Sequence, residues 1–571
     1  MRVAVGIDIG TSNCCVCIAR PLAALPSVAQ IEVVPSASGA HLTPSMIAVG
    51  VDNNVLVGEI AKQQQADNPL RTFYNFKRVL GLPYTSQTLW EKAWSCSLAQ
   101  SRDQPQTPVF VVADSTGATA REYTAQALYK IMAQHLADLA RSRLAPGEIV
   151  GAVTVTVPIH FNATQRAQTR DAVRAAFPPE VHCAVLDEPV AAVTAYMQQN
   201  RLRLSDLGAS DHIMVFDLGG GTLDVTLLRP SSSTPLSSTA TVGAQSALAD
   251  KLHACATAQD GLHVCASSGL STLGGVDFDA AILKSVQEQY YKQTKRDIKA
   301  DKTLTARARH AAEDAKIALS LHTSTTLVFD SAAKFAMPIT RANFDRWIRP
   351  YLQQASKVMY AVLAQIPIEP HKVTDVIVVG GSAQVPAVRA MVAEFFRPHT
   401  VRMRNDVNPT ESVAYGAAAH AFASLGLYVN DAPPSTPQTT ASAANKPTIN
   451  KSTTNNTQTK IVPALSGAIG IRLPHGVVRQ MLARNTRLPC SATLDVYPVR
   501  ANQSQAVVRV YQGDSDIVTP DTALLATLCI PLRRAADRLR LELAMDTSGL
   551  LHMRLFNMLT KCDVTQKLLV S

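Results

Sequence analysis

A pattern of strand, aspartate, glycine turn and returning strand occurs twice in this chain, about two hundred residues apart. Residues 3–19 are apolar and β-branched and are interrupted by Gly10-Thr11-Ser12-Asn13. Residues 213–228 repeat the arrangement around Gly219-Gly220-Gly221-Thr222. Each copy predicts two strands joined by a tight turn. The repetition predicts a duplicated lobe, with a cleft between the two copies.

Both turns have the composition of a phosphate site. Glycines let backbone N–H groups approach phosphate oxygens closely, and the Thr and Ser hydroxyls can donate to the same oxygens. An aspartate precedes each turn, Asp8 in the first copy and Asp217 in the second. Two such carboxylates facing a nucleotide would hold Mg²⁺ through its waters. One glycine turn alone is usually only a hairpin, but two with matching acids favour a nucleotide site.

The overall composition limits the class of protein. The chain has 571 residues, and a length of this size predicts roughly three or four structural units. Hydrophobic residues make up 47% and charged residues 17%, which excludes a globally disordered chain. The formal net charge is +10, but no run of five Lys or Arg residues occurs, so a dedicated nucleic-acid arm is not expected.

The N-terminus and the cysteines bear on location. Acidic and glycine residues stand where a signal peptide needs an unbroken apolar stretch, and no run approaches the roughly eighteen apolar residues of a membrane helix. Ten cysteines in so long a chain favour a reduced compartment. Cys14, Cys15 and Cys17 continue an apolar strand, which favours buried thiols over a structural zinc site. We expect a cytoplasmic protein without membrane contact.

Strands alternate with helices along the first 427 residues, which predicts an α/β layer architecture. A helix is predicted from Ala163 to Phe177 after a cap at Asn162. A third glycine turn, Gly380-Gly381-Ser382, precedes a helix that begins near Pro386, and such a helix N-terminus can meet an anion. Residues 1–427 are thus predicted as one domain.

The boundaries within and after this domain follow from composition. Its lobes are predicted at about 1–205 and about 206–427, with a low-complexity insertion at 229–260. The segment 428–460 is predicted as a flexible linker, because 21 of its last 30 residues are Ser, Thr, Asn, Gln or Pro. Residues 461–571 show short alternating apolar runs separated by turn residues, which predicts an antiparallel β-domain.

Six motifs resemble, in order, the signatures of the DnaK-type chaperones, the seventy-kilodalton heat-shock family. They are Gly6-Ile7-Asp8-Ile9-Gly10-Thr11-Ser12, Val155-Thr156-Val157-Pro158 with Phe161-Asn162, Asp187-Glu188-Pro189 with Ala191-Ala192, Phe216-Asp217-Leu218-Gly219-Gly220-Gly221-Thr222, Leu273-Gly274-Gly275 with Asp277-Phe278-Asp279, and Gly380-Gly381-Ser382. The resemblance covers nearly the whole chain. It implies an α/β, actin-like ATPase with two lobes around a nucleotide cleft, joined to a C-terminal antiparallel β-sandwich that binds extended peptides. ATP or ADP with Mg²⁺ is the implied cofactor.

The resemblance also implies a role for each matching residue. The implied catalytic residues are Lys77 beside the γ-phosphate, Glu188 orienting the attacking water, Asp217 and Thr222. The residues implied to bind nucleotide are Asp8, Gly10, Thr11, Ser12, Asn13, Gly219, Gly220, Gly221, Asp224, Gly274, Gly275, Glu313, Lys316, Ser320, Gly380, Gly381 and Ser382. Asp8 and Asp217 are implied to hold the metal through water, and Asp224 to lie near those waters. Such a site supplies alignment and charge neutralisation, which is most of what phosphoryl transfer requires.

Helical spacing places Glu313, Lys316 and Ser320 on one face, although spacing alone would favour a solvated charged face. The chain also departs from the family pattern. Ile317 and Gln384 stand where some members clamp adenine between two arginines, so weaker nucleotide binding is expected. The leucine- and aspartate-rich connector between the domains has no evident counterpart, and no helical lid follows the β-domain. These departures resemble the lidless, truncated, ribosome-associated members, and we expect the two halves to be thermodynamically uncoupled.

The resemblance implies an ATP-binding, slowly ATP-hydrolysing chaperone that assists protein folding. Its implied partners are a J-domain co-chaperone, a nucleotide exchange factor and unfolded or nascent polypeptide, with the ribosome as a further partner of the subclass. One alternative is a non-catalytic ribosome-associated scaffold that partners a J-domain protein. A second is a small-molecule kinase with the actin-like fold, which a peptide-binding-like β-domain disfavours.

Overall fold

The computed structural model describes most of the chain. The residues outside the described part are 23–24, 51, 86–95, 114–119, 201–211, 231–260, 367, 398, 400, 405–406, 429–459, 463–464, 466, 473–477, 485, 497–503, 514–522, 533–537, 547–548 and 570–571. The expected insertion and linker lie almost wholly among them, as does the expected lobe boundary near residue 205. No helix of the described part is long and apolar enough to cross a membrane.

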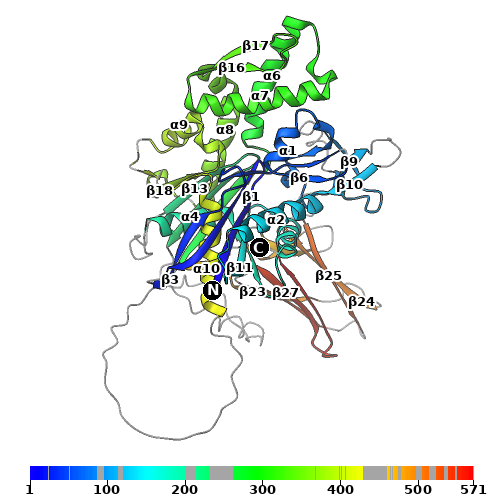
Figure 1. The fold of residues 1–571 in the computed structure, drawn as a ribbon. Helices are drawn as coiled ribbons and strands as arrows, with labels where there is room; N and C mark the ends of the chain where they lie inside the picture. Colours follow the sequence, from blue (N-terminus) through cyan, green and yellow to red (C-terminus); the bar gives the residue numbers. More distant parts are fainter. Residues whose placement is uncertain are drawn as a thin grey trace.

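The first copy of the repeated pattern forms the centre of one sheet (Figure 1). Strand β1 (Arg2–Ile9) pairs antiparallel with β2 (Asn13–Leu22) and parallel with β11 (Ile149–Val157). The strand order is β12-β11-β1-β2-β3, with β12 (His182–Asp187) and β3 (Leu25–Val33) outermost. The expected α/β architecture is therefore confirmed.

Helices cover both faces of this sheet, which is why its central strands are nearly continuous apolar runs. Val3, Val5 and Ile7 pack with the helix α2 (Ala125–Ser142) on one face. The alternate residues of the same strands, such as Ala4, pack with α10 (Ser412–Tyr428) on the other. The three neighbouring cysteines of β2 are buried thiols, as expected.

The second copy of the pattern builds a second sheet with the same strand order. Strand β13 (His212–Leu218) pairs antiparallel with β14 (Leu223–Pro230) and parallel with β18 (Val373–Val379). The strand order is β19-β18-β13-β14-β15. Strand β15 (Gly261–Leu270) therefore occupies the place that β3 has in the first sheet, and β19 (Arg402–Arg404) the place of β12. This correspondence of pairing and direction is what a duplicated lobe requires.

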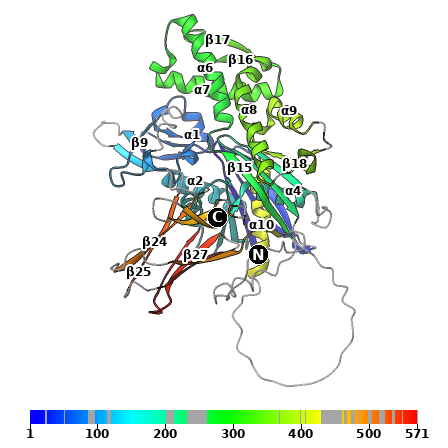
Figure 2. The same ribbon diagram turned by 180° about the vertical axis from the view of Figure 1, so that it is seen from behind.

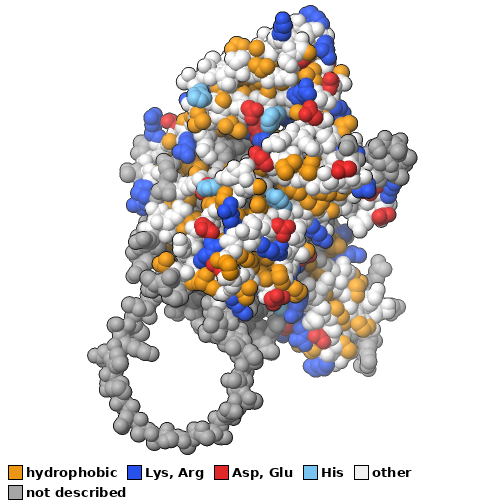
Figure 3. Space-filling model, in the orientation of Figure 1, with side chains coloured by type: hydrophobic (Ala, Val, Ile, Leu, Met, Phe, Trp, Pro, Cys, Tyr) orange, Lys and Arg blue, Asp and Glu red, His pale blue; other side chains and the backbone are white. Residues whose placement is uncertain are grey.

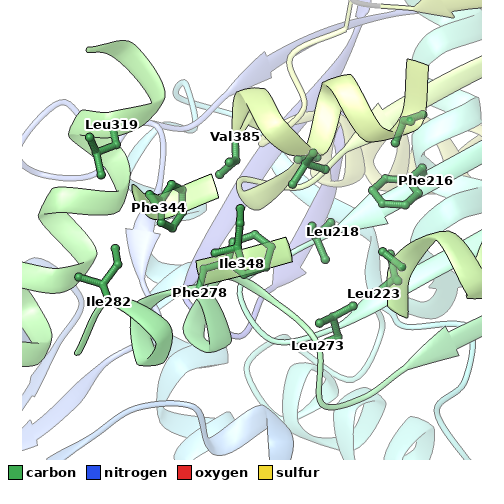
Figure 4. Close-up of a cluster of buried hydrophobic side chains, with 14 of the residues drawn as sticks. Phe216, Leu218, Leu223, Leu273, Phe278, Ile282, Leu319, Phe344, Ile348 and Val385 are labelled. Carbon is green, nitrogen blue, oxygen red and sulfur yellow. The ribbon is translucent and has the colours of Figure 1, made fainter. Parts of the chain in front are cut away.

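The core of the second lobe lies between its sheet and its helices. Figure 4 shows Phe278 of α6 (Gly275–Thr294) and Ile348 of α8 (Arg341–Gln365) in the middle of this cluster, with Phe216 and Leu223 of the sheet to their right. These side chains are almost completely buried. Helix α6 starts at the last glycine of the Leu273-Gly274-Gly275 motif, so the core fixes the position of that motif.

Further elements extend each lobe beyond its sheet (Figures 1 and 2). The first lobe adds β4 (Thr43–Pro44), β5 (Ile47–Val49), β6 (Val55–Val57), α1 (Glu59–Gln64), β7 (Thr72–Phe73), β8 (Ser97–Gln100), β9 (Pro108–Ala113), β10 (Ala120–Thr124), α3 (Ala163–Arg174) and α4 (Glu188–Gln199). The second adds α7 (Lys302–Leu321), β16 (Ser324–Val328), β17 (Ala336–Thr340) and α9 (Pro386–Phe395). Two predicted helix starts are confirmed: a capping box between Asn162 and Gln165 begins α3, and Pro386 begins α9.

The C-terminal residues form two four-stranded antiparallel sheets. One has the order β22-β21-β24-β25 and the other β23-β26-β27-β28. Their strands are β21 (Ile469–Arg472), β22 (Val478–Leu482), β23 (Cys490–Val496), β24 (Gln505–Gln512), β25 (Ala523–Pro531), β26 (Leu539–Met545), β27 (Leu550–Asn557) and β28 (Asp563–Leu569). Val510 and Leu528 of the sheet that contains β24 and β25 and Leu541 and Met553 of the sheet that contains β26 and β27 belong to one hydrophobic core. The described part of residues 461–571 contains strands and no helix.

A short strand connects this C-terminal part to the second lobe. Strand β20 (Lys460–Val462) pairs in parallel with residues 261–263 of β15 and becomes the outermost strand of the second-lobe sheet. Residues 461 and 462 therefore belong to that sheet, and the C-terminal domain starts after them rather than at 461.

The C-terminal sheets also contact both lobes. Strand β28 contacts α3 of the first lobe, and Ala163 of α3 is buried with the C-terminal core. The Arg484 guanidinium donates to the backbone oxygen of Ser267 in β15, at 3.2 Å. Both views place these strands beside the first lobe (Figures 1 and 2). The expectation of uncoupled halves rests on the polar segment, which lies outside the described residues apart from Lys460, so it stays a prediction. The contacts of β20 and β28 with the two lobes are the observation that stands against it.

Candidate functional site

The two glycine turns meet where the two lobes come together. A methyl group at Gly220 would lie 2.1 Å from Oγ of Ser12, and one at Gly221 would lie 2.6 Å from Cγ2 of Thr11. Side chains at these glycines would push the turns apart. The close approach therefore requires glycine, and it brings the backbone of both turns to one place.

The second turn is also held by the start of α6. The backbone N–H groups of Gly275 and Val276 donate to the oxygens of Gly219 and Gly220, at 3.1 and 2.9 Å. A methyl group at Gly274 would lie 2.5 Å from the Gly221 nitrogen. The Leu273-Gly274-Gly275 motif thus lies against the second turn, as the resemblance implies.

Four elements beside the turns carry the predicted charged residues. Asp8 and Asp217 lie near the ends of β1 and β13, Glu188 begins α4, and Lys77 lies in the short 3₁₀ helix Phe76–Arg78. Lys77 and Glu188, 111 residues apart in the chain, form a buried ion pair with Nζ–Oε1 at 2.8 Å. Asp8 accepts a hydrogen bond from Thr156 Oγ1 at 2.9 Å. The antiparallel pairing of β13 with β14 places Asp217 directly opposite Asp224, on the same face of the sheet.

These acids repel one another in a poorly solvated space. Burial raises the pKa of Glu188 to about 7, with further upward contributions from Asp8 and Asp224 and an opposing one from Lys77. Burial and the carboxylates of Glu188, Asp224 and Asp8 raise the pKa of Asp217 well above its usual range. Burial also raises the pKa of Asp8, although the charge of Lys77 opposes the shift.

The cluster therefore holds four carboxylates around one buried ammonium, that of Lys77. The pKa of Lys77 is raised, because the Glu188 and Asp8 carboxylates more than offset the effect of burial. The Lys77 ammonium therefore stays charged. The excess of negative charge and the oxygen donors suit a hard divalent cation such as Mg²⁺. The residues present thus fit the cofactor that the resemblance implies.

The residues expected at the nucleoside form a second group on α6 and α7. Lys316 Nζ lies 2.9 Å from Oδ1 of Asp279, and burial raises the pKa of Asp279 to about 6. A methyl group at Gly275 would lie 2.4 Å from Ser382 Oγ and 3.1 Å from Lys316 Nζ. Ser320 Oγ donates to the backbone oxygen of Lys316 at 3.2 Å. Lys316, Gly275 and Ser382 are therefore brought together, with Ser320 one helical turn along.

Other expected residues lie farther out. Glu313 forms an ion pair with Lys62 of the first lobe, at 3.4 Å, so it links the two lobes. Asn13 and Gly381 are exposed. A methyl group at Gly380 would lie 2.8 Å from Oδ1 of Asp217, so the third glycine turn reaches the carboxylate cluster through Gly380.

Several residues of this region received no role from the sequence. Arg78 donates to the Gly221 oxygen at 2.8 Å and forms an ion pair with Asp277 at 3.0 Å, both in the second lobe. Ser45 Oγ donates to the Gly10 oxygen at 2.7 Å. Arg78 adjoins Lys77, and Thr156 lies within a recognised motif, so their positions gave a signal. Nothing local to Ser45 indicated its contact.

Comparison with known proteins accounts for this arrangement. The family model described as Hsp70 protein matches residues 4–242 and 255–432, which is most of the chain. The chain belongs to the Hsp70 family. Hsp70 proteins are chaperones that use ATP with Mg²⁺, are ATPases of the actin-like fold, and act on polypeptides together with co-chaperones. The resemblance drawn from the six motifs is thereby confirmed.

Curated relatives align beyond the region of the family model. The chaperone protein DnaK of Thermotoga petrophila is 28% identical over 559 residues, which is 96% of this chain and 77% of the relative. The DnaK of Thermosipho africanus is also 28% identical, over 560 residues and the same shares of both chains. A ribosome-associated molecular chaperone of Eremothecium gossypii is 27% identical over 565 residues, 96% of this chain and 79% of the relative.

Proposed function

We propose that this chain is a slowly ATP-hydrolysing chaperone whose catalytic centre is the Lys77–Glu188 pair with Asp8 and Asp217. The observation that carries the proposal is that these four charged groups, distant in sequence, converge where the two glycine turns meet. A site that binds ATP without hydrolysing it would have no need for a buried lysine–glutamate pair beside Asp8 and Asp217, the two acids proposed to hold the metal.

Each group has a chemical task in this proposal. Backbone N–H groups of both turns, with the Thr11 and Thr222 hydroxyls, bind phosphate oxygens. Asp8 and Asp217 would hold Mg²⁺ through its waters, and the metal would supply charge neutralisation. Glu188 accepts a hydrogen bond from the attacking water and orients it. Lys77 stabilises the charge that develops on the transferred phosphoryl group.

The C-terminal sheets are proposed to act on protein partners. Two antiparallel sheets over one core form the framework of a β-sandwich, and we assign to it the binding of extended segments of unfolded or nascent polypeptide. A J-domain co-chaperone and a nucleotide exchange factor complete the cycle, and the proposed location is the cytoplasm. The contacts of β20 and β28 with the two lobes give a route by which nucleotide could affect this domain.

The alternative of a ribosome-bound scaffold has one supporting observation. Residues 431–571 carry 16 basic and 9 acidic side chains, so this part of the chain holds much of the positive charge. On the face shown in Figure 3, however, basic and acidic side chains are interspersed rather than gathered in one patch. A mixed surface of this kind gives weak attraction to RNA.

Phosphate release at steady state, measured with and without a J-domain protein, tests the proposed function. We expect slow basal turnover that the J-domain protein accelerates. Absence of turnover under both conditions would contradict hydrolysis and favour the scaffold. Release of a phosphorylated small molecule instead of free phosphate would favour the kinase.

A further prediction concerns the adenine pocket. Gln384 and Ile317 are both exposed, and neither side chain carries a cation that could stack on the base. We expect Gln384→Arg to tighten ATP and ADP by a similar factor, up to about tenfold, because a guanidinium stacked on the base is indifferent to the γ-phosphate. Isothermal titration calorimetry with both nucleotides measures this. Unchanged or weaker affinity would mean that the base does not lie beside residue 384.

A further inference from the structure

His160 links the two lobes at the carboxylate cluster. It lies in the loop of residues 158–162, between β11 and α3 of the first lobe. Its Nδ1 lies 2.8 Å from Oδ1 of Asp224 on β14 of the second lobe. The Asp224 side chain is 1% exposed, so its carboxylate depends on protein groups such as this imidazole for hydrogen bonds.

The loop that carries His160 is held rigidly from the first lobe. The buried Arg166 guanidinium donates to the backbone oxygens of Phe161 and Ile159, at 3.0 and 3.3 Å, on either side of His160. The Phe161 N–H donates to the Pro158 oxygen at 3.0 Å. The imidazole therefore approaches Asp224 from a fixed base, as a positioning group must.

The second lobe leaves space for this contact at Gly269. This residue pairs with Asp224 across β14 and β15. A methyl group there would lie 2.7 Å from Oδ1 of Asp224 and 3.4 Å from Nδ1 of His160. The same methyl group would lie 2.6 Å from the backbone oxygen of Leu223, so a side chain at this position would displace the carboxylate from the imidazole, the adjoining β14 backbone, or both.

Asp224 in turn acts on the catalytic acids. Its carboxylate is one of the charges that raise the pKa of both Asp217 and Glu188. Its orientation therefore affects the field at the two acids that have central tasks in the proposed hydrolysis. A small displacement of one charge in a poorly solvated site changes that field substantially.

We propose that His160 is a positioning residue of the nucleotide site, which holds Asp224 of the opposite lobe and thereby aligns the acids for ATP hydrolysis. This inference rests on the proposed function, since it concerns the rate of that reaction. It assigns to the imidazole a role in the chemical step rather than in nucleotide affinity.

The test uses the full chain with His160→Ala, His160→Asn and Gly269→Ala. The asparagine amide nitrogen can occupy the position of the imidazole Nδ1, so His160→Asn keeps the donor and serves as the conservative variant. His41→Ala is the matched control, because His41 also contacts a carboxylate at 2.8 Å, that of Glu411, outside the cluster. Single-turnover hydrolysis of bound ATP, ATP affinity by calorimetry and thermal unfolding are measured for each variant.

We expect His160→Ala and Gly269→Ala to slow single-turnover hydrolysis about tenfold or more, with ATP affinity changed less than about twofold. His160→Asn should recover most of the rate, and His41→Ala should match the wild type. A rate for His160→Ala within about twofold of the wild type, or no recovery with asparagine, would overturn the proposal.

Hydrogen exchange of the nucleotide-free protein gives a readout independent of hydrolysis. Amides of residues 158–162 and of β14 should exchange faster in His160→Ala and Gly269→Ala than in the wild type or in His41→Ala. Unchanged exchange would show that the contact does not join the lobes, which also overturns the inference. If the wild type itself shows no turnover, the proposed function fails, and the exchange data alone decide whether His160 holds the second lobe.

Discussion

Lys77→Ala should slow hydrolysis of bound ATP by about a hundredfold or more while changing ATP affinity little. The reason is that a buried cation beside the transferred phosphoryl group stabilises charge that develops in the transition state. Removing one such electrostatic group commonly costs about 10² to 10³ in rate.

The structure adds a second reason for a large loss. Lys77 lowers the pKa of Glu188, which lies at about 7 even with the ammonium present. Without Lys77 this pKa rises further, so at neutral pH more of the Glu188 carboxyl is protonated. A protonated carboxyl cannot accept the hydrogen bond that orients the attacking water, so both proposed tasks are lost together.

Single-turnover hydrolysis and calorimetric ATP affinity check this prediction. Lys130→Ala is a suitable control, because Lys130 is exposed on α2 of the same lobe. Hydrolysis by Lys77→Ala within about fivefold of the wild type would contradict the assigned role. If the wild type hydrolyses ATP no faster than Lys77→Ala, the proposal that this chain hydrolyses ATP is wrong.

Arg166→Ala should lower the free energy of unfolding by about 3 to 5 kcal/mol. The Arg166 side chain is 1% exposed, and its ion pair with the buried Asp187 has an N–O distance of 2.5 Å. The same guanidinium satisfies two backbone oxygens of the loop at 158–162. Alanine would leave the Asp187 carboxyl and both oxygens buried without these donors.

The effect should extend to catalysis, because Asp187 directly precedes Glu188. Burial raises the pKa of Asp187 even though Arg166 opposes the shift, so without the guanidinium this pKa rises further and the carboxyl takes up a proton more readily. The start of α4 and the loop at 158–162 would lose their common anchor. We therefore expect slower hydrolysis in addition to the loss of stability.

Urea unfolding followed by circular dichroism measures the stability change. Arg170→Ala on the same helix is the control, because its ion pair with Asp171 is more exposed and should contribute only about 0 to 1 kcal/mol. A double-mutant cycle with Asp187→Ala isolates the energy of the pair. A loss of unfolding free energy below about 1 kcal/mol for Arg166→Ala would contradict the prediction, because it would show that the buried ion pair contributes little to stability.

Local chemistry explains why part of the site could be predicted from the sequence. Glycine turns between apolar strands, each after an aspartate, depend on residues adjacent in the chain, so both turns and both acids were found in place. The repetition of the pattern predicted that the two turns face each other, and the structure brings them to one place. The tasks of Lys77 and Glu188 came from resemblance to a family, because an isolated lysine or glutamate carries no local signal.

The sequence alone determined the strand–turn–strand units, the starts of α3 and α9 and the antiparallel strands of the C-terminal part, since each depends on periodicity, capping or turn residues within a short window. Only the tertiary structure decided which distant groups meet: Lys77 with Glu188, His160 with Asp224, and β20 with the edge of the second-lobe sheet. Strand β20 begins at the last residue of the segment that is predicted as a tether, and its pairing depends on a partner edge that composition does not reveal. Contacts between residues far apart in the chain are set by how whole sheets and helices pack, and no local pattern records that packing.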